Sequence, residues 1–482
     1  MMKHLIKYII VIIFFTSLFS ACKRDKFFSG TPTINFSTDT LSFDTVFTNI
    51  GSTTGYFKIY NPYNQKLKIN SIALEGGASS MFRLNIDGVS TNSATEIEME
   101  AHDSIYVFVA VTVNPNNTNN PMVVFDRVKI NTNNNTQQVV LQAFGQDVYL
   151  HKQRKDLSNK ADTFYVGQTE LWKNDKPHLV LGTGIVDKNS LLTIQKGAKI
   201  FMHKNANLYV FGQLSAIGTK TDSIVFQGDR LEHYFDELPG QWGSLVFIRG
   251  CQPCSLTHCI IKNGTNGIIA GSNTSSLASD YNLSNKPIIN INKCLIKNCE
   301  ESAVFSFLAD VNATNSAFFN CNKNVLQLLF GGTQVFTNCT IANFSSSDIQ
   351  HNDAVLRISN WAAFGSTAYL ADVDATFTNS IVYGTIDKDK EIIIDQDQGV
   401  GNKYDYVFDH CMLRTDIATT AQPTHFVNCI INTDPLFKSN YSNLRITGTS
   451  TAIDAGKNNS ITDDLDDNLR IGLPDIGCYE FK

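Results

Sequence analysis

Three stretches of the chain, SLTHCIIKNG (255–264), INKCLIKNCE (291–300) and VFTNCTIANF (335–344), carry one pattern and decide the fold. In each stretch a polar residue precedes Cys, and hydrophobic residues flank the pair on both sides. A turn rich in Asn or Gly follows. Self-similar units of this size predict a solenoid, in which each unit is one coil that stacks on the next.

All copies of the unit align on one column of small side chains. The intervals between column residues run from 18 to 41 residues and fit a coil of roughly 20 to 25 residues with insertions. Thiols stacked along one line give no tetrahedral metal cluster, so we expect them to be buried, unpaired and structural. The column contains Cys259, Cys294, Ser316, Cys339, Ser380, Cys411 and Cys429.

The segments LLTIQKGAKIFMHKNANLYVFGQLSAIG (191–218) and PGQWGSLVF (239–247) resemble the opening coils of right-handed parallel β-helix repeat proteins. This resemblance extends over about residues 165–440 and implies a β-helix over 165–432. The fold class that we expect is therefore all-β.

The last segment, 433–482, resembles the C-terminal segment of bacterial surface β-helix proteins. The shared pattern includes DPLF (434–437), STAIDAG (450–456) and DIGCYE (475–480), whereas Asp467, Leu469 and Cys478 depart from it. The resemblance implies a terminal cap that shields the last open strand edge.

A separate β pattern precedes the repeats, over residues 34–148. In SIYVFVAVTV (104–113), Ile105 and the valines alternate with other residues, the period of a strand that is buried on one face. Several such runs fit an immunoglobulin-like sandwich. The stretch LSFDTVFTNIGSTTGYFKIYNP (41–62) resembles Ig-like domains of the ASH and major-sperm-protein kind. We expect a tether at 22–33 and a linker at 149–164.

The chain begins with MMKHLIKYIIVIIFFTSLFSAC (1–22), in which lysines precede an apolar run and small residues precede Cys22. This is the anatomy of a secretory signal over 1–21. The Cys after the small pair resembles a lipobox, although Phe19 stands where Leu is usual. The resemblance implies a palmitate-type lipid anchor at Cys22, on the outer membrane of a Gram-negative bacterium. An ordinary secretory signal is the alternative.

Removing residues 1–21 leaves 37 basic and 45 acidic residues, a formal net charge of −8. Such a surface repels the phosphate backbone, so no nucleic-acid partner is expected.

Candidate catalytic residues come from three acids spaced by 21 residues, Asp353, Asp374 and Asp395, together with Arg357 and Lys388. In β-helix polysaccharide lyases, carboxylates on neighbouring coils hold calcium against a uronate while Lys or Arg removes a proton. Here Asp374 lies six residues before Ser380, whereas Asp395 lies sixteen before Cys411. Because these registers disagree, chance spacing is the alternative. Asp416 continues the spacing, and His351 lies nearby.

A second acidic group, Asp464, Asp466 and Asp467, offers oxygen ligands of the kind that calcium prefers. The alternative is a turn in which Asp464 and Arg470 form the segment's own hydrogen bonds. No other cofactor is indicated.

Cys251 and Cys254 form a C-x-x-C without a second such pair, which favours a loop disulfide or two plain thiols.

These observations predict an exported lipoprotein that acts without catalysis as a binding or structural protein, with glycan or another surface partner as its ligand. The alternative is a polysaccharide lyase or glycoside hydrolase acting on an acidic polysaccharide. The second reading rests on analogy between folds. The oligomeric state is not indicated.

Overall fold

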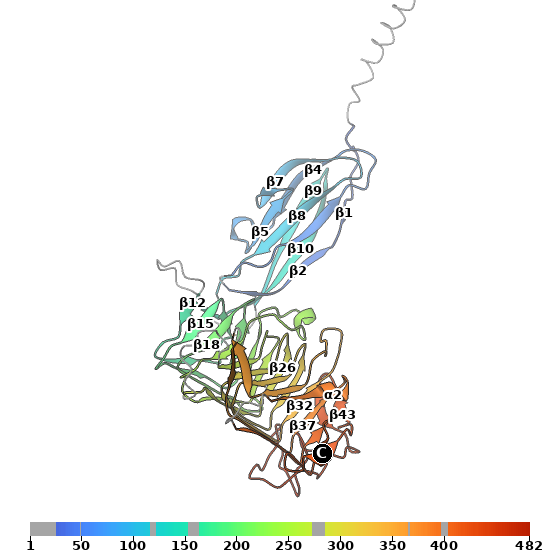
Figure 1. Cartoon of the computed structure of the whole chain (residues 1–482). Helices are drawn as coiled ribbons and strands as arrows, with labels where there is room; N and C mark the ends of the chain where they lie inside the picture. The colour runs from blue at the N-terminus through green and yellow to red at the C-terminus, as the bar shows by residue number, and fades with distance from the viewer. Residues whose placement is uncertain are drawn as a thin grey trace, which may run out of the picture. The chain divides into compact units, whose positions relative to one another are not determined.

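In the computed structural model, residues 26–48, 50–115, 122–152, 163–271, 285–364, 367–396 and 403–482 are described. The signal segment and Cys22 lie outside these ranges. The chain divides into one compact unit that ends at Asp147 and a second from Val148 to Lys482. Both are built of strands (Figure 1), so the predicted all-β fold class is confirmed.

The N-terminal unit is a sandwich of two five-stranded sheets. Every pair of neighbouring strands is antiparallel except β2 and β10, which run parallel. The core lies between the sheets and includes Phe57, Ile69, Val107 and Leu141, all fully buried. One sheet has the order β1 (Asn35–Phe36), β3 (Gly55–Tyr60), β8 (Ser104–Val111), β5 (Phe82–Ile86), β6 (Val89–Ser90). The other has the order β2 (Thr40–Phe47), β10 (Asn135–Gln146), β9 (Met122–Thr132), β4 (Leu67–Leu74), β7 (Ser93–Met99).

The second unit is a right-handed β-helix of three parallel sheets, and each coil gives one strand to each sheet except the last coils, in which the described residues form no strand of the nine-stranded sheet. An eleven-stranded sheet contains β11 (Tyr149–His151), β14 (His178–Val180), β17 (Lys199–Met202), β20 (Ile224–Gly228), β23 (Cys259–Lys262), β26 (Leu295–Cys299), β29 (Ala317–Cys321), β32 (Thr340–Asn343), β37 (Ile381–Gly384), β40 (Met412–Leu413) and β42 (Ile430–Ile431).

The two other sheets follow the same rule. A nine-stranded sheet contains β12 (Thr163–Tyr165), β15 (Thr183–Val186), β18 (Asn207–Val210), β21 (Leu245–Phe247), β24 (Ile268–Gly271), β27 (Val304–Phe307), β30 (Leu326–Leu329), β33 (Leu356–Ser359) and β38 (Ile392–Asp395). A ten-stranded sheet contains β13 (Thr169–Trp172), β16 (Leu191–Ile194), β19 (Gln213–Ile217), β22 (Cys254–Thr257), β25 (Ile288–Asn292), β28 (Asp310–Thr314), β31 (Gly332–Thr337), β36 (Val373–Thr378), β39 (Tyr404–Asp409) and β41 (Phe426–Val427).

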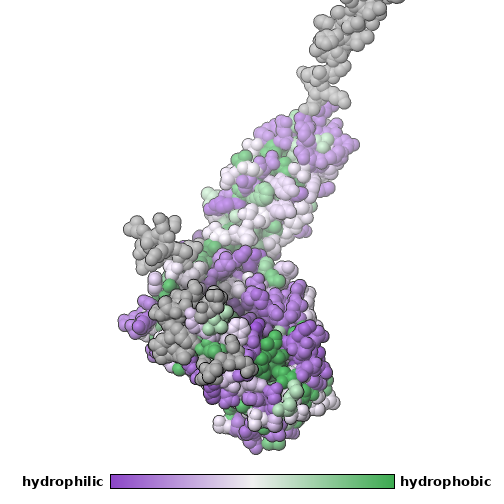
Figure 2. All heavy atoms as spheres, in the orientation of Figure 1, coloured by the Kyte–Doolittle hydropathy of each residue, from purple (hydrophilic) through white to green (hydrophobic). Residues whose placement is uncertain are grey.

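Two hairpins and four short helices complete the described elements. The hairpins are β34 (Trp361–Phe364) with β35 (Thr367–Leu370), and β43 (Phe437–Ser439) with β44 (Asn443–Ile446). The helices are η1 (Gly77–Ser79), η2 (His233–Phe235), α2 (Lys388–Glu391) and η4 (Thr419–Ala421). Figure 2 shows that hydrophobic side chains also occur on the surface of each unit, interspersed with hydrophilic ones.

The β-helix begins earlier than the sequence suggests. Residues 149–164, expected to be a linker, include β11 and the first residues of β12, which pair in parallel with β14 and β15. The segment is short and lacks the repeated Cys pattern, so its sequence resembles a connection, although Tyr149–His151 and residues 163–164 already belong to the first coil.

The repeated pair of a polar residue and Cys or Ser forms the corner between the ten-stranded and eleven-stranded sheets. The polar residue adopts the left-handed conformation in every copy, with φ between 45° and 52°. Asn tolerates this conformation better than most residues, which explains its frequency here. The corner residues are His258, Lys293, Asn315, Asn338, Asn379, His410 and Asn428.

The column of Cys and Ser side chains is internal. Backbone N–H groups donate to the small side chain of the next coil: from Cys259 to Sγ of Cys294 (3.4 Å), and from Cys294 to Oγ of Ser316 (3.0 Å). Each hydroxyl or thiol also donates to a carbonyl two residues earlier, such as Ser316 to Thr314 at 2.8 Å. A small side chain with one donor therefore fits this site. Cys429 alone among the column cysteines is only partly buried.

The C-terminal segment, residues 433–482, runs along the side of the β-helix. Its Leu465, Ile476 and Tyr479 pack with Phe319 and Ile381 of the eleven-stranded sheet. It also contacts corner residues of several coils, from Lys293 to Asn379. The outer face of this sheet is itself apolar, and the segment covers it, a placement that the sequence analysis did not predict.

Candidate functional site

The evenly spaced acids do not form one column. Asp374 lies in β36 of the ten-stranded sheet, where its Oδ2 is 2.7 Å from Nζ of Lys403. Asp395 ends β38 in the nine-stranded sheet. The residue that pairs with Asp374 in the next coil is Asp405, 31 residues further on, so an interval of 21 residues from Asp374 ends in a different sheet.

Arg357 and Asp395 are the predicted residues that the fold brings together. They lie on neighbouring strands, and Nη2 of Arg357 is 2.8 Å from Oδ2 of Asp395. Nε1 of Trp361, which the sequence did not single out, donates to the other carboxylate oxygen at 3.1 Å. Both carboxylate oxygens are thus engaged, and the partly exposed pair stabilises the fold by less than about 1 kcal/mol.

The remaining candidates lie apart from this pair. Asp353, Lys388 and Asp416 are exposed, and Lys388 begins α2. His351 is fully buried instead, with Nε2 3.4 Å from Oε2 of Glu391.

The buried cluster around His351 was missed by the sequence analysis. Backbone N–H of Ile386 donates to Oε1 of Glu391 at 2.8 Å, and that oxygen lies 3.7 Å from Nε of Arg414. His351, Glu391 and Arg414 come from three segments that are far apart in the sequence, so no local motif marked them. The cluster lies at the end of β37. Here Gly384 is so close to the Glu391 carboxylate that any larger residue at position 384 would clash with it.

The candidate calcium ligands have protein partners. Asp464 is fully buried and accepts hydrogen bonds from the backbone N–H groups of Asp466, Asn468 and Glu480. Asp466 pairs with Arg445, and Asp467 pairs with Lys293 at 2.5 Å. In the described ranges, no three His, Cys, Asp or Glu side chains are grouped to hold a metal ion. Calcium binding here stays a prediction.

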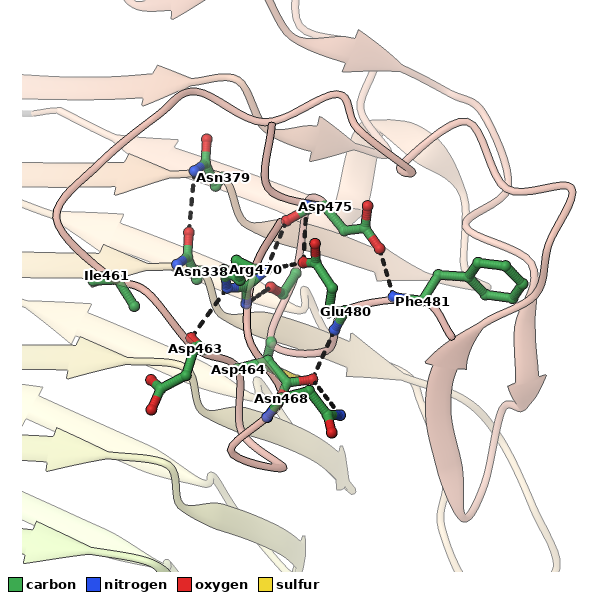
Figure 3. Close-up of polar contacts among 12 residues, drawn as sticks. Asn338, Asn379, Ile461, Asp463, Asp464, Asn468, Arg470, Asp475, Glu480 and Phe481 are labelled. Carbon is green, nitrogen blue, oxygen red and sulfur yellow. Dashed lines mark hydrogen bonds and ion pairs between the residues drawn. The ribbon is translucent and has the colours of Figure 1, made fainter. Parts of the chain in front are cut away.

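Arg470 holds the C-terminal segment together (Figure 3). Its guanidinium is almost completely buried and pairs with Oε2 of Glu480 at 2.9 Å. It also donates to the carbonyl oxygens of Asp463, Asp475 and Gly477. Burial raises the pKa of Glu480 and of Asp475 above their usual range. This arrangement is internal hydrogen bonding rather than an open site.

Cys251 and Cys254 are both buried, and both are free thiols in the structure. The backbone N–H of Leu214 donates to Sγ of Cys254 at 3.2 Å. A hydrogen bond from Cys254 lowers the pKa of the Cys251 thiol, and the same contact together with burial raises the pKa of Cys254.

Three aromatic rings gather on the outer face of the first sheet of the sandwich, and we call Tyr56, Tyr106 and Phe108 the aromatic surface. Tyr56 lies 5.5 Å from Tyr106 and 6.0 Å from Phe108, and the rings of Tyr106 and Phe108 are stacked 5.7 Å apart. Tyr56 is 53% exposed and Tyr106 is 37% exposed. Exposed rings that gather in one place on a surface are candidates for an interaction site.

The strand period places these rings together. Val107 and Val109 of β8 point into the core, so Tyr106 and Phe108 between them point outward. The register pairs Tyr56 with Phe108 and Lys58 with Tyr106 across β3 and β8. The alternation in 104–113 therefore already indicated that Tyr106 and Phe108 lie on the outer face, but it was used only to predict the buried face of the strand.

Comparison with known proteins gives no family. No protein-family description and no curated protein sequence matches the chain. Among solved structures, it is similar over 23% of its length to a family 123 glycoside hydrolase from Clostridium perfringens (4% identity, TM-score 0.17, 26% of that chain).

Two further structures are the Salmonella enterica SafA pilin in complex with the SafB chaperone (10% identity) and the E. coli chaperone DraB (9% identity). Each covers 25% of this chain with a TM-score of 0.17. The chain spans 57% and 56% of the lengths of these two chains. Likeness at this level carries no argument about fold or function.

Within the described part of the chain, no helix is both long and apolar enough to cross a membrane.

Proposed function

We propose that the protein is a membrane-anchored surface lipoprotein that binds glycan through its aromatic surface without cleaving it. The observation that supports this most directly is the group of exposed rings formed by Tyr56, Tyr106 and Phe108. A β-helix fold is consistent with a glycan-related function, but the fold alone is analogy.

The chemistry of the rings suits a sugar. A pyranose has apolar C–H faces and a polar rim of hydroxyl groups, so it stacks on a flat ring and forms hydrogen bonds at its edge. Tyrosine supplies both features, an apolar body and a hydroxyl that donates and accepts. Asn85 lies opposite Phe108 in the neighbouring strand and adds an amide at the edge of the rings.

The anchor in this proposal is a lipid on Cys22, at the outer membrane, with the protein facing the periplasm or the cell surface. Two or more acyl chains hold a protein stably in a membrane, whereas one chain gives marginal binding.

Catalysis is the alternative. Its strongest residues, Arg357 and Asp395, bind each other, and Asp374 lies in a different sheet. Cleavage of polysaccharide by the purified protein would establish that alternative.

The test uses the purified chain from residue 23 to 482 and a panel of neutral and anionic polysaccharides. Binding is measured by affinity electrophoresis, and cleavage by the absorbance of unsaturated products. Tyr106→Ala should weaken binding about tenfold, because an exposed stacking ring contributes roughly 1.5 kcal/mol.

The matched control is Phe125→Ala, which removes a ring that is 65% exposed in β9 of the other sheet. It should leave binding unchanged. Equal binding by Tyr106→Ala and the unsubstituted protein would contradict the proposal.

A further inference from the structure

The aromatic surface lies between two cations. Lys58 stands in β3, and its Nζ is 4.4 Å from the centroid of the Tyr106 ring. Arg83 is exposed in β5, where it is paired with Ala110 of β8. Neither side chain forms an ion pair with any residue that the structure describes.

These two cations differ from others in the sandwich. Lys66, Lys68, Arg127 and Lys129 each pair with a glutamate, for example Lys129 with Glu75 at 2.7 Å. Paired cations have their charge largely satisfied within the unit. The charges of Lys58 and Arg83 are available to a ligand.

Acidic residues are missing from the strands that form this surface. The sequences of β3, β5 and β8, GYFKIY, FRLNI and SIYVFVAV, contain no Asp or Glu. The nearest acids along the chain, Asp87 and Asp103, lie in turns at the strand ends. In a chain of net negative charge, this face is therefore locally positive.

Lys58 stays charged at neutral pH. A hydrogen bond with Tyr106 raises the pKa of Lys58 above its usual value. Arg83 uses Nη1 for the carbonyl oxygens of Ser80 and Phe82, which holds the side chain in place. Its other guanidinium N–H groups form no hydrogen bond within the described residues.

The two cations are well separated. They lie two strands apart and about four residues apart along the strands, which gives roughly 16 Å between their backbones. Tyr56, Tyr106 and Phe108 occupy the space between them. A single sugar cannot reach both cations, whereas a chain with repeated acidic groups can.

We infer that the aromatic surface binds a polyanionic glycan, with Lys58 and Arg83 contacting its carboxylate or sulfate groups and the rings stacking on its sugars. This rests on the proposed function. Single-stranded nucleic acid also combines rings with negative charge, and it is therefore tested as a competing ligand in the experiment.

The experiment compares matched polymers that differ in charge alone. Polygalacturonate is set against its fully methyl-esterified form, and dextran sulfate against dextran, with the chain from 23 to 482 as the binding protein. We expect at least one charged polymer to bind tenfold or more tightly than its neutral partner. The pair that shows the preference distinguishes carboxylate from sulfate.

Variants assign the preference to residues. Lys58→Gln and Arg83→Gln should each weaken binding of the charged polymer about fivefold and leave the neutral polymer unaffected. Lys129→Gln, which removes a cation of the other sheet, is the matched control and should change neither. Tyr106→Ala should weaken binding of both polymers.

The outcomes separate the two proposals. Equal binding of charged and neutral polymers, lost in Tyr106→Ala, overturns the inference and leaves the proposed function standing. Binding of neither pair overturns the inference, and failure of the whole polysaccharide panel overturns the proposed function as well. Tighter binding of an oligothymidylate than of any glycan, lost in Lys58→Gln, also overturns the inference.

Discussion

The corner residue Asn379 contributes both through its backbone conformation and through the hydrogen bonds of its side chain. Its φ is 49°, and its amide donates to the carbonyl of Lys457 (2.8 Å) and to Oδ1 of Asn338 (3.1 Å). Its Oδ1 accepts the N–H of Lys457 at 2.7 Å. The same side chain that tolerates the left-handed conformation thus also holds the C-terminal segment.

Asn379→Ala and Asn379→Gly separate these two contributions. Both variants lose the amide hydrogen bonds, but Ala adds strain of roughly 1 kcal/mol at positive φ. We expect Ala to destabilise the protein by about 1 kcal/mol more than Gly, measured by urea unfolding of the second unit. Equal midpoints for the two variants would show that backbone conformation is not limiting here.

Thiol reactivity should differ strongly along the chain. The pKa of Cys251 is lowered by its hydrogen bond with Cys254, whereas burial raises the pKa of Cys339 and lies behind the raised pKa of Cys411. Because the thiolate is the nucleophile, Cys251 should react before Cys339 and Cys411 with iodoacetamide in the native protein at pH 7.5. Peptide mass spectrometry over time measures this order. Modification of Cys339 as fast as Cys251 would contradict it.

At the scale of elements, the C-terminal segment should respond to acid through Lys457. Burial alone would raise the pKa of Asp409, but hydrogen bonds with Lys457 and His410 outweigh it and lower that pKa. A lowered pKa in the folded state stabilises the fold above the unfolded value of about 3.9, and this contribution is lost as the pH falls further. Glu480 has the opposite sign, because its raised pKa favours the folded state at acid pH.

The expected result is weaker hydrogen-exchange protection around Lys457 as the pH falls from 5 to 3, after correction for intrinsic exchange. Asp409→Asn should have lower protection at pH 5 and little further loss on acidification. The region around Glu480 serves as the internal control and should not lose protection in the same range. Loss of protection that is equal in Asp409→Asn and the unsubstituted protein would exclude this ion pair as the cause.

Elements differed in how far the sequence predicted them. The column through Cys259 and Cys294 could be predicted from the sequence, because every coil places a small side chain directly after a corner residue in the left-handed conformation. The path of residues 433–482 could not be predicted from the sequence, because it depends on contacts of Arg470 and of apolar residues with parts of the chain that are far away in sequence. The acids Asp374 and Asp395 misled for a related reason, because the coil that starts at Asp374 is long and the residue that pairs with Asp374 in the next coil is Asp405.

At the scale of the whole molecule, two units with separate cores have separate roles in the proposal. The sandwich has the aromatic surface, and the β-helix has a long side covered by its own C-terminal segment. The segment replaces solvent over one apolar sheet face. Under the proposal, substitutions in the aromatic surface should therefore affect binding without affecting the stability of the β-helix.

Both roles assume that the protein is held at a membrane, and this rests on Cys22, which lies outside the described residues. Small residues precede Cys22 directly, and the apolar run before them is too short to span a bilayer. We expect metabolic labelling with palmitate to mark the wild-type protein and the protein to sediment with membranes. Cys22→Ser should lose the label and enter the soluble fraction, because the acyl chains supply the affinity for the bilayer.

The control is Cys251→Ser, which keeps Cys22 and should remain labelled. A Cys22→Ser protein that stays in the membrane fraction, with no label in the wild type, would show that the lipoprotein interpretation is wrong.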